Sequence, residues 1–174
     1  MPGPEIGGML DEALHCCQSG DLGRAEQIYR KILALDAGTA DAWNMLAVAQ
    51  LLNGRFDEAW ECSLQATRLR PQLPPYWLIR GNIALARHQY AEAQTALSRA
   101  VELEPSFAEA HYRLALVYHR QHRIADAVAA YRAALRFAPD VAEIHFKLAE
   151  ALLQNDRWDE ALRAFEAAFA RDPD

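Results

Sequence analysis

The sequence predicts an all-α solenoid in which five antiparallel helix pairs follow one another along the chain. The first observation behind this prediction is an alanine that recurs at a constant interval of 34 residues (59 − 25 for the first pair), at Ala25, Ala59, Ala93, Ala127 and Ala161. The second is that each interval holds two helical patterns, and the third is a turn residue at a fixed place between them. Units of this length cannot bury an apolar face alone, so they stack.

Three further rows of residues keep step with these anchor alanines. A bulky apolar side chain stands three residues before each anchor, at Leu22, Phe56, Tyr90, Ile124 and Trp158. A residue with little or no side chain stands twelve before it, at Ala13, Ala47, Gly81, Ala115 and Ala149. Proline, which ends a helix, stands twelve after the last four anchors, at Pro71, Pro105, Pro139 and Pro173.

The second interval shows how its two helices are predicted. Apolar residues recur at helical spacing from Trp43 to Leu51, and the segment 53–55 then interrupts the pattern. A second run extends from Phe56 to Ala66 and ends before Pro71. Connections of only a few residues force neighbouring helices to lie antiparallel.

The turn between the two helices falls five residues before each anchor, at Gly20, Gly54, His88, His122 and Asp156. We expect a left-handed backbone at these positions, which glycine adopts without strain and which Asn, Asp and His tolerate. His88 and His122 therefore have a backbone role before any chemical one.

Polar residues near the helix starts predict how those starts are stabilised. Ser106 and Glu109 have the spacing of a capping box, and Asp140 with Glu143 is an acidic version of it. The pairs 57–58 and 159–160, Asp followed by Glu in each case, place negative charge in the first turn of second helices, where the helix dipole favours it.

Composition restricts the classes of function. The chain has 174 residues, is 52% hydrophobic, and carries 18 Lys and Arg against 24 Asp and Glu, a formal net charge of −6. This balance argues against a nucleic acid or an anionic membrane as partner. No apolar stretch approaches the ~18 residues of a membrane-spanning helix, and the first residues lack a signal-peptide pattern. Three cysteines without paired spacing indicate a reducing compartment, so we expect a cytoplasmic location.

No motif for catalysis or for a cofactor is present. The sequence has no phosphate-binding glycine loop, no GxSxG and no HExxH. His111 and His145 take the same place in successive intervals, and His119 and His122 are three apart, but no Cys, Asp or Glu completes a set of metal ligands. We therefore expect packed or surface histidines, no metal, no cofactor and no catalytic residue.

The rows together resemble the tetratricopeptide repeat (TPR) family. The residues that carry the resemblance are Trp43, Trp77, Leu46, Leu114, Leu148, Gly81, Tyr118, Tyr29, Tyr131, Phe165, the anchor alanines and the prolines. The resemblance implies a right-handed solenoid forming a single domain over residues 1–174, with repeats at about 6–38, 39–72, 73–106, 107–140 and 141–174. The sequence departs from the family pattern at Met9, at Ala37-Gly38, and at His111 and His145, which replace tryptophan.

Members of this family mostly act as scaffolds that bind a peptide in a concave groove lined by the first helix of each repeat, so three rows on one face of these helices form the candidate groove. The first row, fifteen residues before the anchors, is Leu10, Asn44, Leu78, Tyr112 and Phe146. The second row, eleven before, is Leu14, Val48, Asn82, Leu116 and Glu150. The third row, eight before, is Cys17, Leu51, Leu85, His119 and Leu153.

Because these rows are mostly apolar, two interpretations are open: packing between repeats, or an exposed groove that marks an interaction site. Asn44 and Asn82 could hydrogen-bond a peptide backbone. Toward the C-terminal end the lining becomes basic, at Arg113, His119, Arg120 and Lys147. Three acids partly offset this positive charge: Glu109, Glu143 and Glu150. The expected partner is a protein or peptide, an apolar or amphipathic segment with an acidic end.

Two alternatives to a scaffold stay open. The chain could be the substrate-recruiting arm of a larger enzyme, such as an O-linked glycosyltransferase-like protein, although the asparagine ladder of such arms is missing fourteen residues before the anchors. It could also self-assemble, because no polar helix follows to cover Leu162, Phe165 and Phe169. Either the sequence is a piece of a longer protein, which the repeat boundary at its end favours, or a second copy covers this end in a homo-oligomer.

Overall fold

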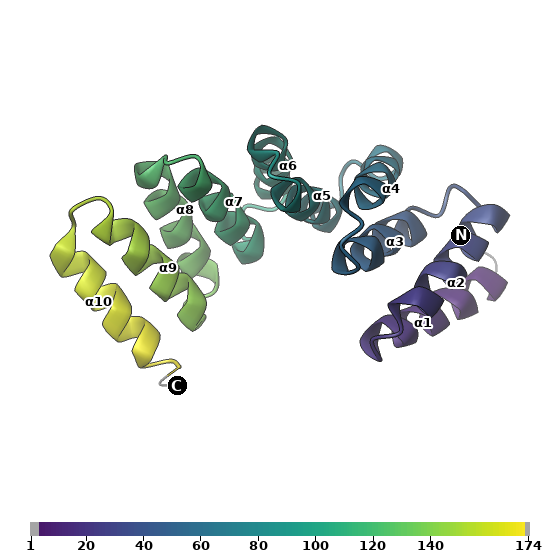
Figure 1. Ribbon diagram of the computed structural model, residues 1–174, viewed down its shortest axis with the longest axis horizontal. Coiled ribbons are helices and arrows are strands. Elements are labelled where there is room, and N and C mark those ends of the chain that lie inside the picture. The colour runs from purple at the N-terminus through teal and green to yellow at the C-terminus, as the bar shows by residue number, and fades with distance from the viewer. Residues whose placement is uncertain (1–3, 173–174) are drawn as a thin grey trace. The chain divides into compact units, whose positions relative to one another are not determined.

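The computed structural model describes residues 4–172, and this part of the chain is entirely helical apart from turns (Figure 1). It contains ten helices: α1 (Pro4–Gln18), α2 (Leu22–Leu35), α3 (Ala40–Leu52), α4 (Phe56–Leu69), α5 (Pro74–Ala86), α6 (Tyr90–Leu103), α7 (Ala108–Arg120), α8 (Ile124–Phe137), α9 (Ala142–Leu153) and α10 (Trp158–Phe169). The prediction of an all-α array of helix pairs is confirmed. Within this described part, every helix is too short or too polar to cross a membrane.

The helices fall into two compact units, residues 1–87 and 88–174. In the first unit α1 packs on α2 and α3 on α4, while α2 and α4 each also contact the helix that follows. In the second unit α7 packs on α8 and α9 on α10, and α6 and α8 contact α7 and α9 respectively. Each unit thus repeats one arrangement, in which a helix pair packs on the helix after it.

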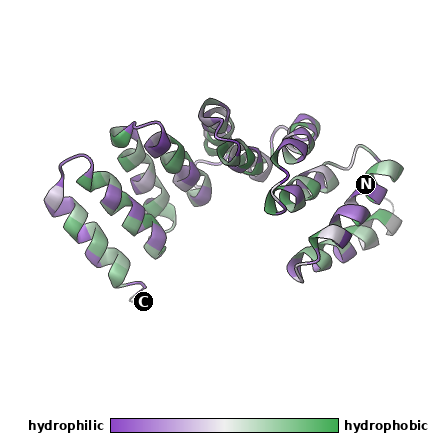
Figure 2. Ribbon diagram, in the orientation of Figure 1, coloured by the Kyte–Doolittle hydropathy of each residue, from purple (hydrophilic) through white to green (hydrophobic). Residues whose placement is uncertain are grey.

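The anchor alanines lie at the centre of this packing. All five have no exposed surface, and so have the four alanines that stand twelve residues before an anchor. The first unit has an apolar core around Ala25, Ala47 and Ala59, and the second has one around Ala127, Ala149 and Ala161. Each helix carries both hydrophobic and hydrophilic residues (Figure 2). Side chains larger than alanine at these positions would separate the paired helices.

The turns confirm the prediction of a left-handed backbone. All five turn residues have positive φ angles, between 55° and 83°. In four of these turns the next residue donates its backbone N–H to the carbonyl five positions earlier, as Arg55 N does to Gln50 O at 2.8 Å. This pattern closes the end of a first helix and satisfies carbonyls that would otherwise lack a partner. His88, His122 and Asp156 are therefore explained by the backbone.

The two predicted capping boxes are wrong. α7 begins at Ala108 and α9 at Ala142, so the capping residues are Phe107 and Val141, and neither helix start has a side-chain cap bond. Ser106 and Asp140 lie one residue too early to reach the free N–H groups. The predicted first-turn acids are present in α4 and α10. Pro71, Pro105 and Pro139 follow the ends of α4, α6 and α8, whereas Pro173 lies outside the described residues.

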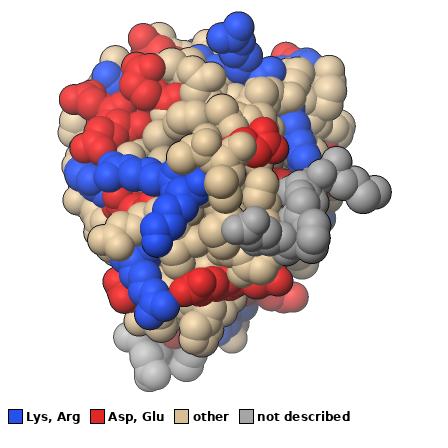
Figure 3. Space-filling view, turned by 90° about the vertical axis from the view of Figure 1, so that its right-hand side faces the viewer, with Lys and Arg blue, Asp and Glu red and all other residues tan. Residues whose placement is uncertain are grey.

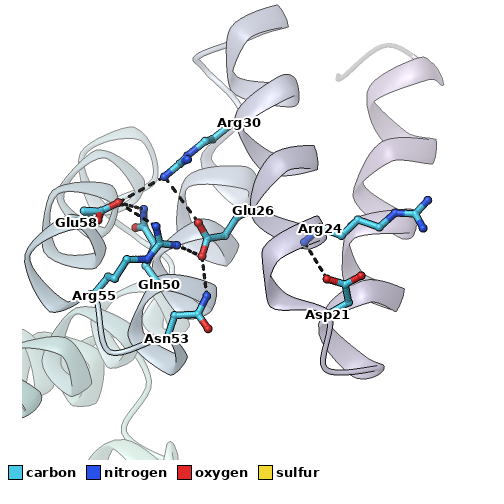
Figure 4. A network of polar contacts seen from close by, with 8 residues as sticks. All are labelled: Asp21, Arg24, Glu26, Arg30, Gln50, Asn53, Arg55 and Glu58. Carbon is cyan, nitrogen blue, oxygen red and sulfur yellow. Dashed lines mark hydrogen bonds and ion pairs between the residues drawn. The ribbon is translucent and has the colours of Figure 1, made fainter.

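A polar network around one buried carboxylate joins the first helix pair to the second (Figure 4). Glu26 of α2 is 4% exposed. Its Oε1 accepts hydrogen bonds from Asn53 Nδ2 at 2.8 Å and from the Arg55 guanidinium, both in the turn between α3 and α4. Arg30 bridges the carboxylates of Glu26 and Glu58, at 3.7 and 3.4 Å. Because Glu26 takes its charge out of water, these partners fix how α2 meets the next pair.

Candidate functional site

The first row of the candidate groove is largely buried. Asn44, Leu78 and Tyr112 are 9%, 6% and 7% exposed, so of the two open interpretations these three residues fit packing between repeats and not an exposed groove. The reason is visible at Tyr112, whose hydroxyl donates to Glu143 Oε1 of α9 at 2.6 Å. Burial and this carboxylate raise the pKa of Tyr112. Tyr112 therefore faces the neighbouring repeat. Leu10 is half-buried, and Phe146 in the last repeat is exposed.

The second and third rows stay partly open to solvent. Leu14 is exposed, and the other members are half-buried: Val48, Asn82, Leu116, Glu150, Cys17, Leu51, Leu85, His119 and Leu153. In the first unit α3 contacts α5, so Val48 and Leu51 lie on a helix beside the one that carries Asn82 and Leu85. We call these four residues the α3–α5 surface. It combines three apolar side chains with one amide.

The amides of the candidate groove have unused hydrogen-bonding capacity. Oδ1 of Asn44 and Oδ1 of Asn82 are buried without a hydrogen-bond partner. A buried acceptor that has lost water and gained no partner costs free energy, on the order of 1–3 kcal/mol. Asn44 is 9% exposed and Asn82 is half-buried, so Asn82 is the more accessible of the two side chains.

Two of the four basic side chains near the C-terminal end, Arg113 and Lys147, are paired with acids on their own helices, whereas His119 Nε2 lies 3.0 Å from Gln154 Oε1 after α9. Arg113 contacts Glu109 at 3.2 Å and Lys147 contacts Glu150 at 2.8 Å, each one turn away. Glu143 accepts a hydrogen bond from the Tyr112 hydroxyl, as described above. Pairs this exposed contribute about 0.5 kcal/mol or less. A ligand carboxylate can therefore replace either acid at small cost.

The histidines that replace tryptophan keep the contact of the residue they replace. Trp43 and Trp77 donate from Nε1 to the carbonyl six residues earlier, both at 2.9 Å. His111 and His145 hydrogen-bond through Nε2 to the Pro105 and Pro139 carbonyls, at 2.9 and 2.7 Å. Since a carbonyl only accepts, Nε2 carries the proton in both rings. Within residues 4–172, no three His, Cys, Asp or Glu side chains are grouped as metal ligands.

The cysteines are unpaired thiols in or beside the core. Cys16 and Cys62 are buried and Cys17 is half-buried, with its Sγ 3.8 Å from the Tyr29 hydroxyl. Burial raises the pKa of Cys62 to about 11. A thiol with so high a pKa is protonated at neutral pH and is a poor nucleophile.

The face of the last helix pair is apolar and open. Trp158, Leu162 and Phe169 of α10 are 63%, 60% and 64% exposed. Phe165, also expected to face solvent, is half-buried because its ring packs edge-to-face on Phe146, with centroids 5.3 Å apart. A pocket of about 320 Å³ adjoins this face, lined by Ala142, Glu143, Phe146, Ala168, Phe169 and Asp172. Sequence reasoning missed Trp158, although its spacing of four residues from Leu162 was the available signal.

Charge is mixed on the surface that Figure 3 draws. Lysine and arginine side chains lie among aspartates and glutamates there, and uncharged atoms cover much of the face.

Sequential helix pairs, buried anchor alanines and left-handed turns at one interval define the class: this chain is a TPR protein. Solved structures agree. A crystal structure of MamA matches with a TM-score of 0.85 at 23% identity, over 92% of this chain and 94% of its own. A second MamA structure, from Desulfovibrio magneticus RS-1, matches with a TM-score of 0.88 at 18% identity, over 99% of this chain and 98% of its own. YrrB, described as a TPR protein with an unusual peptide-binding site, matches with a TM-score of 0.77 at 21% identity, over 95% of this chain and 86% of its own. At these identities the likeness shows the fold.

The family follows from a sequence match. Residues 8–174 match the family described as the cilia and flagella-associated protein 70 C-terminal domain, and the chain belongs to that family. Among curated proteins, the transcription factor tau 131 kDa subunit of Saccharomyces cerevisiae (strain ATCC 204508 / S288c) is 24% identical over 117 residues, which are 67% of this chain. The match spans only 11% of that subunit.

Proposed function

We propose that this chain is a non-catalytic module that binds an extended, mainly apolar segment of another protein along the first helices of its repeats. The observation that carries the proposal is the α3–α5 surface. Val48, Leu51 and Leu85 are each half open to solvent, and Leu51 also packs against the core of the first unit. Apolar side chains kept together at a surface mark an interaction site.

The chemistry of the α3–α5 surface fits an extended chain. Each apolar side chain covered by a ligand contributes through the area removed from water, about 25 cal/mol per Å². Asn82 adds direction, because an amide offers a donor and an acceptor to a peptide group, and its Oδ1 has no partner. This combination of apolar side chains and an amide supports a ligand that has apolar side chains along one edge and unpaired backbone N–H and C=O groups along the other.

The second unit supports an acidic residue in the ligand. Arg113 and Lys147 are half-buried cations whose partners, Glu109 and Glu150, lie one turn away on the same helix. A carboxylate from the ligand would exchange with these weak pairs. The description of YrrB as a peptide-binding TPR protein supports the class of function and says nothing of these residues.

Selection from a random peptide library, followed by fluorescence polarisation, tests the proposal. The double variant Val48→Asp/Leu85→Asp should bind the selected peptide at least tenfold more weakly, because binding would move each carboxylate from water into contact with an apolar side chain of the peptide. Asn82→Ala should weaken it about tenfold through the lost hydrogen bond. The matched control is Leu69→Asp, an exposed leucine at the end of a second helix, which should change affinity less than twofold.

Thermal unfolding of each variant separates lost binding from lost folding, and Leu51→Ala serves as a milder change if the aspartates unfold the chain. Full affinity in the folded double variant would remove the α3–α5 surface from the account.

A further inference from the structure

The exposed face of α10 is a continuous apolar stripe. Trp158, Leu162, Phe165 and Phe169 follow one another at spacings of four, three and four residues, which places them on one side of a helix with 3.6 residues per turn. The residues that α10 turns toward α9 are a separate, buried set: Ala161, Ala164 and Ala168. The stripe is therefore additional to the contact that holds the last pair together.

The preceding repeat shows what kind of surface this is. Val128 and Tyr131, which stand 34 residues before Leu162 and Phe165, are 3% and 0% exposed. Tyr112, 34 before Phe146, is buried as well. α9 contacts α8 in this repeat, and α9 also provides Glu143 to Tyr112. One repeat earlier, the equivalent of the stripe is thus a helix–helix interface, so the stripe is built to accept a helix.

We propose that the helix it accepts is α10 of a second copy, packed antiparallel across a two-fold axis midway between residues 163 and 164. The stripe is symmetric about that midpoint. Trp158 and Phe169 lie equally far from it, and so do Leu162 and Phe165. An antiparallel pair therefore sets Trp158 against Phe169 of the second copy and Leu162 against its Phe165. An isologous contact requires such self-complementarity.

Charges and shape agree with this register. Asp156 and Arg171 are also equally far from the midpoint, so each end of the pair sets a carboxylate against a guanidinium. Both residues are exposed, and the long, exposed pair of Arg171 with Asp140, at 3.6 Å, would exchange for Asp156 of the second copy. Phe169, which faces Trp158 of the second copy, lines the pocket of about 320 Å³. An indole seated in that pocket is the type of buried anchor that dominates interface energies.

The exposed area sets the expected strength. At about 200 Å² for each large side chain, the open fractions of Trp158, Leu162, Phe169 and Phe146 sum to on the order of 450 Å². This lies within the size of patches that mark interaction sites and below the ~800 Å² per partner of a standard interface, which the flanking side chains must complete. The dimer should therefore form reversibly as concentration rises.

Light scattering across a concentration series tests the proposal. The mass of the native chain should rise from that of one copy toward twice that value, and Leu162→Glu/Phe169→Glu should stay at one copy throughout. Both positions are exposed, so these changes leave the core intact. The matched control is Leu35→Glu/Leu69→Glu, two exposed leucines on second helices of the first unit, which should dimerise like the native chain. Circular dichroism confirms the fold of each.

Disulfide trapping tests the register. Mixing Trp158→Cys chains with Phe169→Cys chains should give a cross-linked dimer, whereas Trp158→Cys alone should not, because an antiparallel pair holds those two positions about 16 Å apart along the axis. The native chain, whose cysteines are buried or half-buried, is the control. The proposal would be overturned if the native chain had the mass of one copy at every concentration, or if Leu162→Glu/Phe169→Glu still formed a dimer. Efficient formation of a disulfide dimer by Trp158→Cys alone would overturn it as well. None of these outcomes depends on peptide binding at the α3–α5 surface.

Discussion

Tyr112 and Tyr131 differ in whether the side-chain hydroxyl has a hydrogen-bond partner, and this difference decides what each hydroxyl contributes to stability. Their rings lie 6.0 Å apart in the core of the second unit. The Tyr112 hydroxyl donates to Glu143, whereas the Tyr131 hydroxyl is buried without a partner. A buried hydroxyl without a hydrogen bond keeps its desolvation cost and gains nothing in return.

Replacing each tyrosine by phenylalanine should therefore change stability in opposite directions. Tyr131→Phe should raise the free energy of unfolding by about 1 kcal/mol, and Tyr112→Phe should lower it by about 1–2 kcal/mol because it leaves Glu143 without its donor. Urea unfolding of both variants beside the native chain measures this. A loss of stability in Tyr131→Phe would mean that its hydroxyl has a partner, such as a buried water.

Cys62 makes the chain sensitive to alkali. Burial raises the pKa of its thiol to about 11, while an unfolded cysteine titrates near 8.5, so above pH 8.5 only the unfolded state loses the proton. The stabilisation is complete below that pH and is lost as pH rises toward 11. Between pH 8 and 10.5 the native chain should lose about 2 kcal/mol more than Cys62→Ala, measured by urea unfolding at both pH values. Equal losses would contradict burial of this thiol.

At the scale of elements, the contact between α2 and the α3–α4 turn depends on Glu26. Glu26→Ala would leave Asn53 without its acceptor and Arg55 with Glu58 alone, at 3.5 Å, and losing these hydrogen bonds should cost about 1–3 kcal/mol. Glu12→Ala removes an exposed partner of Arg24 and should cost less than 1 kcal/mol. Denaturant midpoints of the two variants give the comparison, and similar shifts would mean that the network of Figure 4 is loose in solution.

Periodicity was enough to predict most of the helices and all five turns. Helix ends follow from breaks in the apolar pattern and from proline, and the turn histidines follow from the backbone that a helix exit requires. The capping boxes at Ser106 and Asp140 failed because a helix start displaced by one residue removes a cap, and periodicity does not resolve one residue.

The candidate site was harder to predict because it depends on helix rotation. The same face of a first helix holds Tyr112, which is buried, and Leu116, which is half open. Neighbouring repeats set that rotation, and no residue pattern records it. The Glu26 network could have been predicted from one departure from the repeat pattern. Glu26 directly follows the anchor Ala25, whereas uncharged residues follow the later anchors: Trp60, Gln94, Val128 and Leu162.

At the scale of the whole molecule, each unit has its own apolar core and its own part of the candidate binding surface. The helices that build the cores are the same ones that carry the second and third rows. We therefore expect binding and stability to be separable by residue, because the anchor alanines are buried and the proposed ligand contacts are half-open residues of the first helices.

Amide hydrogen exchange of the chain with and without a selected peptide is the most direct test of this account. A peptide bound on the first helices should slow exchange in α3 and α5, the helices that carry Val48, Leu51, Asn82 and Leu85, and leave exchange in α4 unchanged. Protection confined to second helices, or to α10, would contradict a binding surface on the first helices.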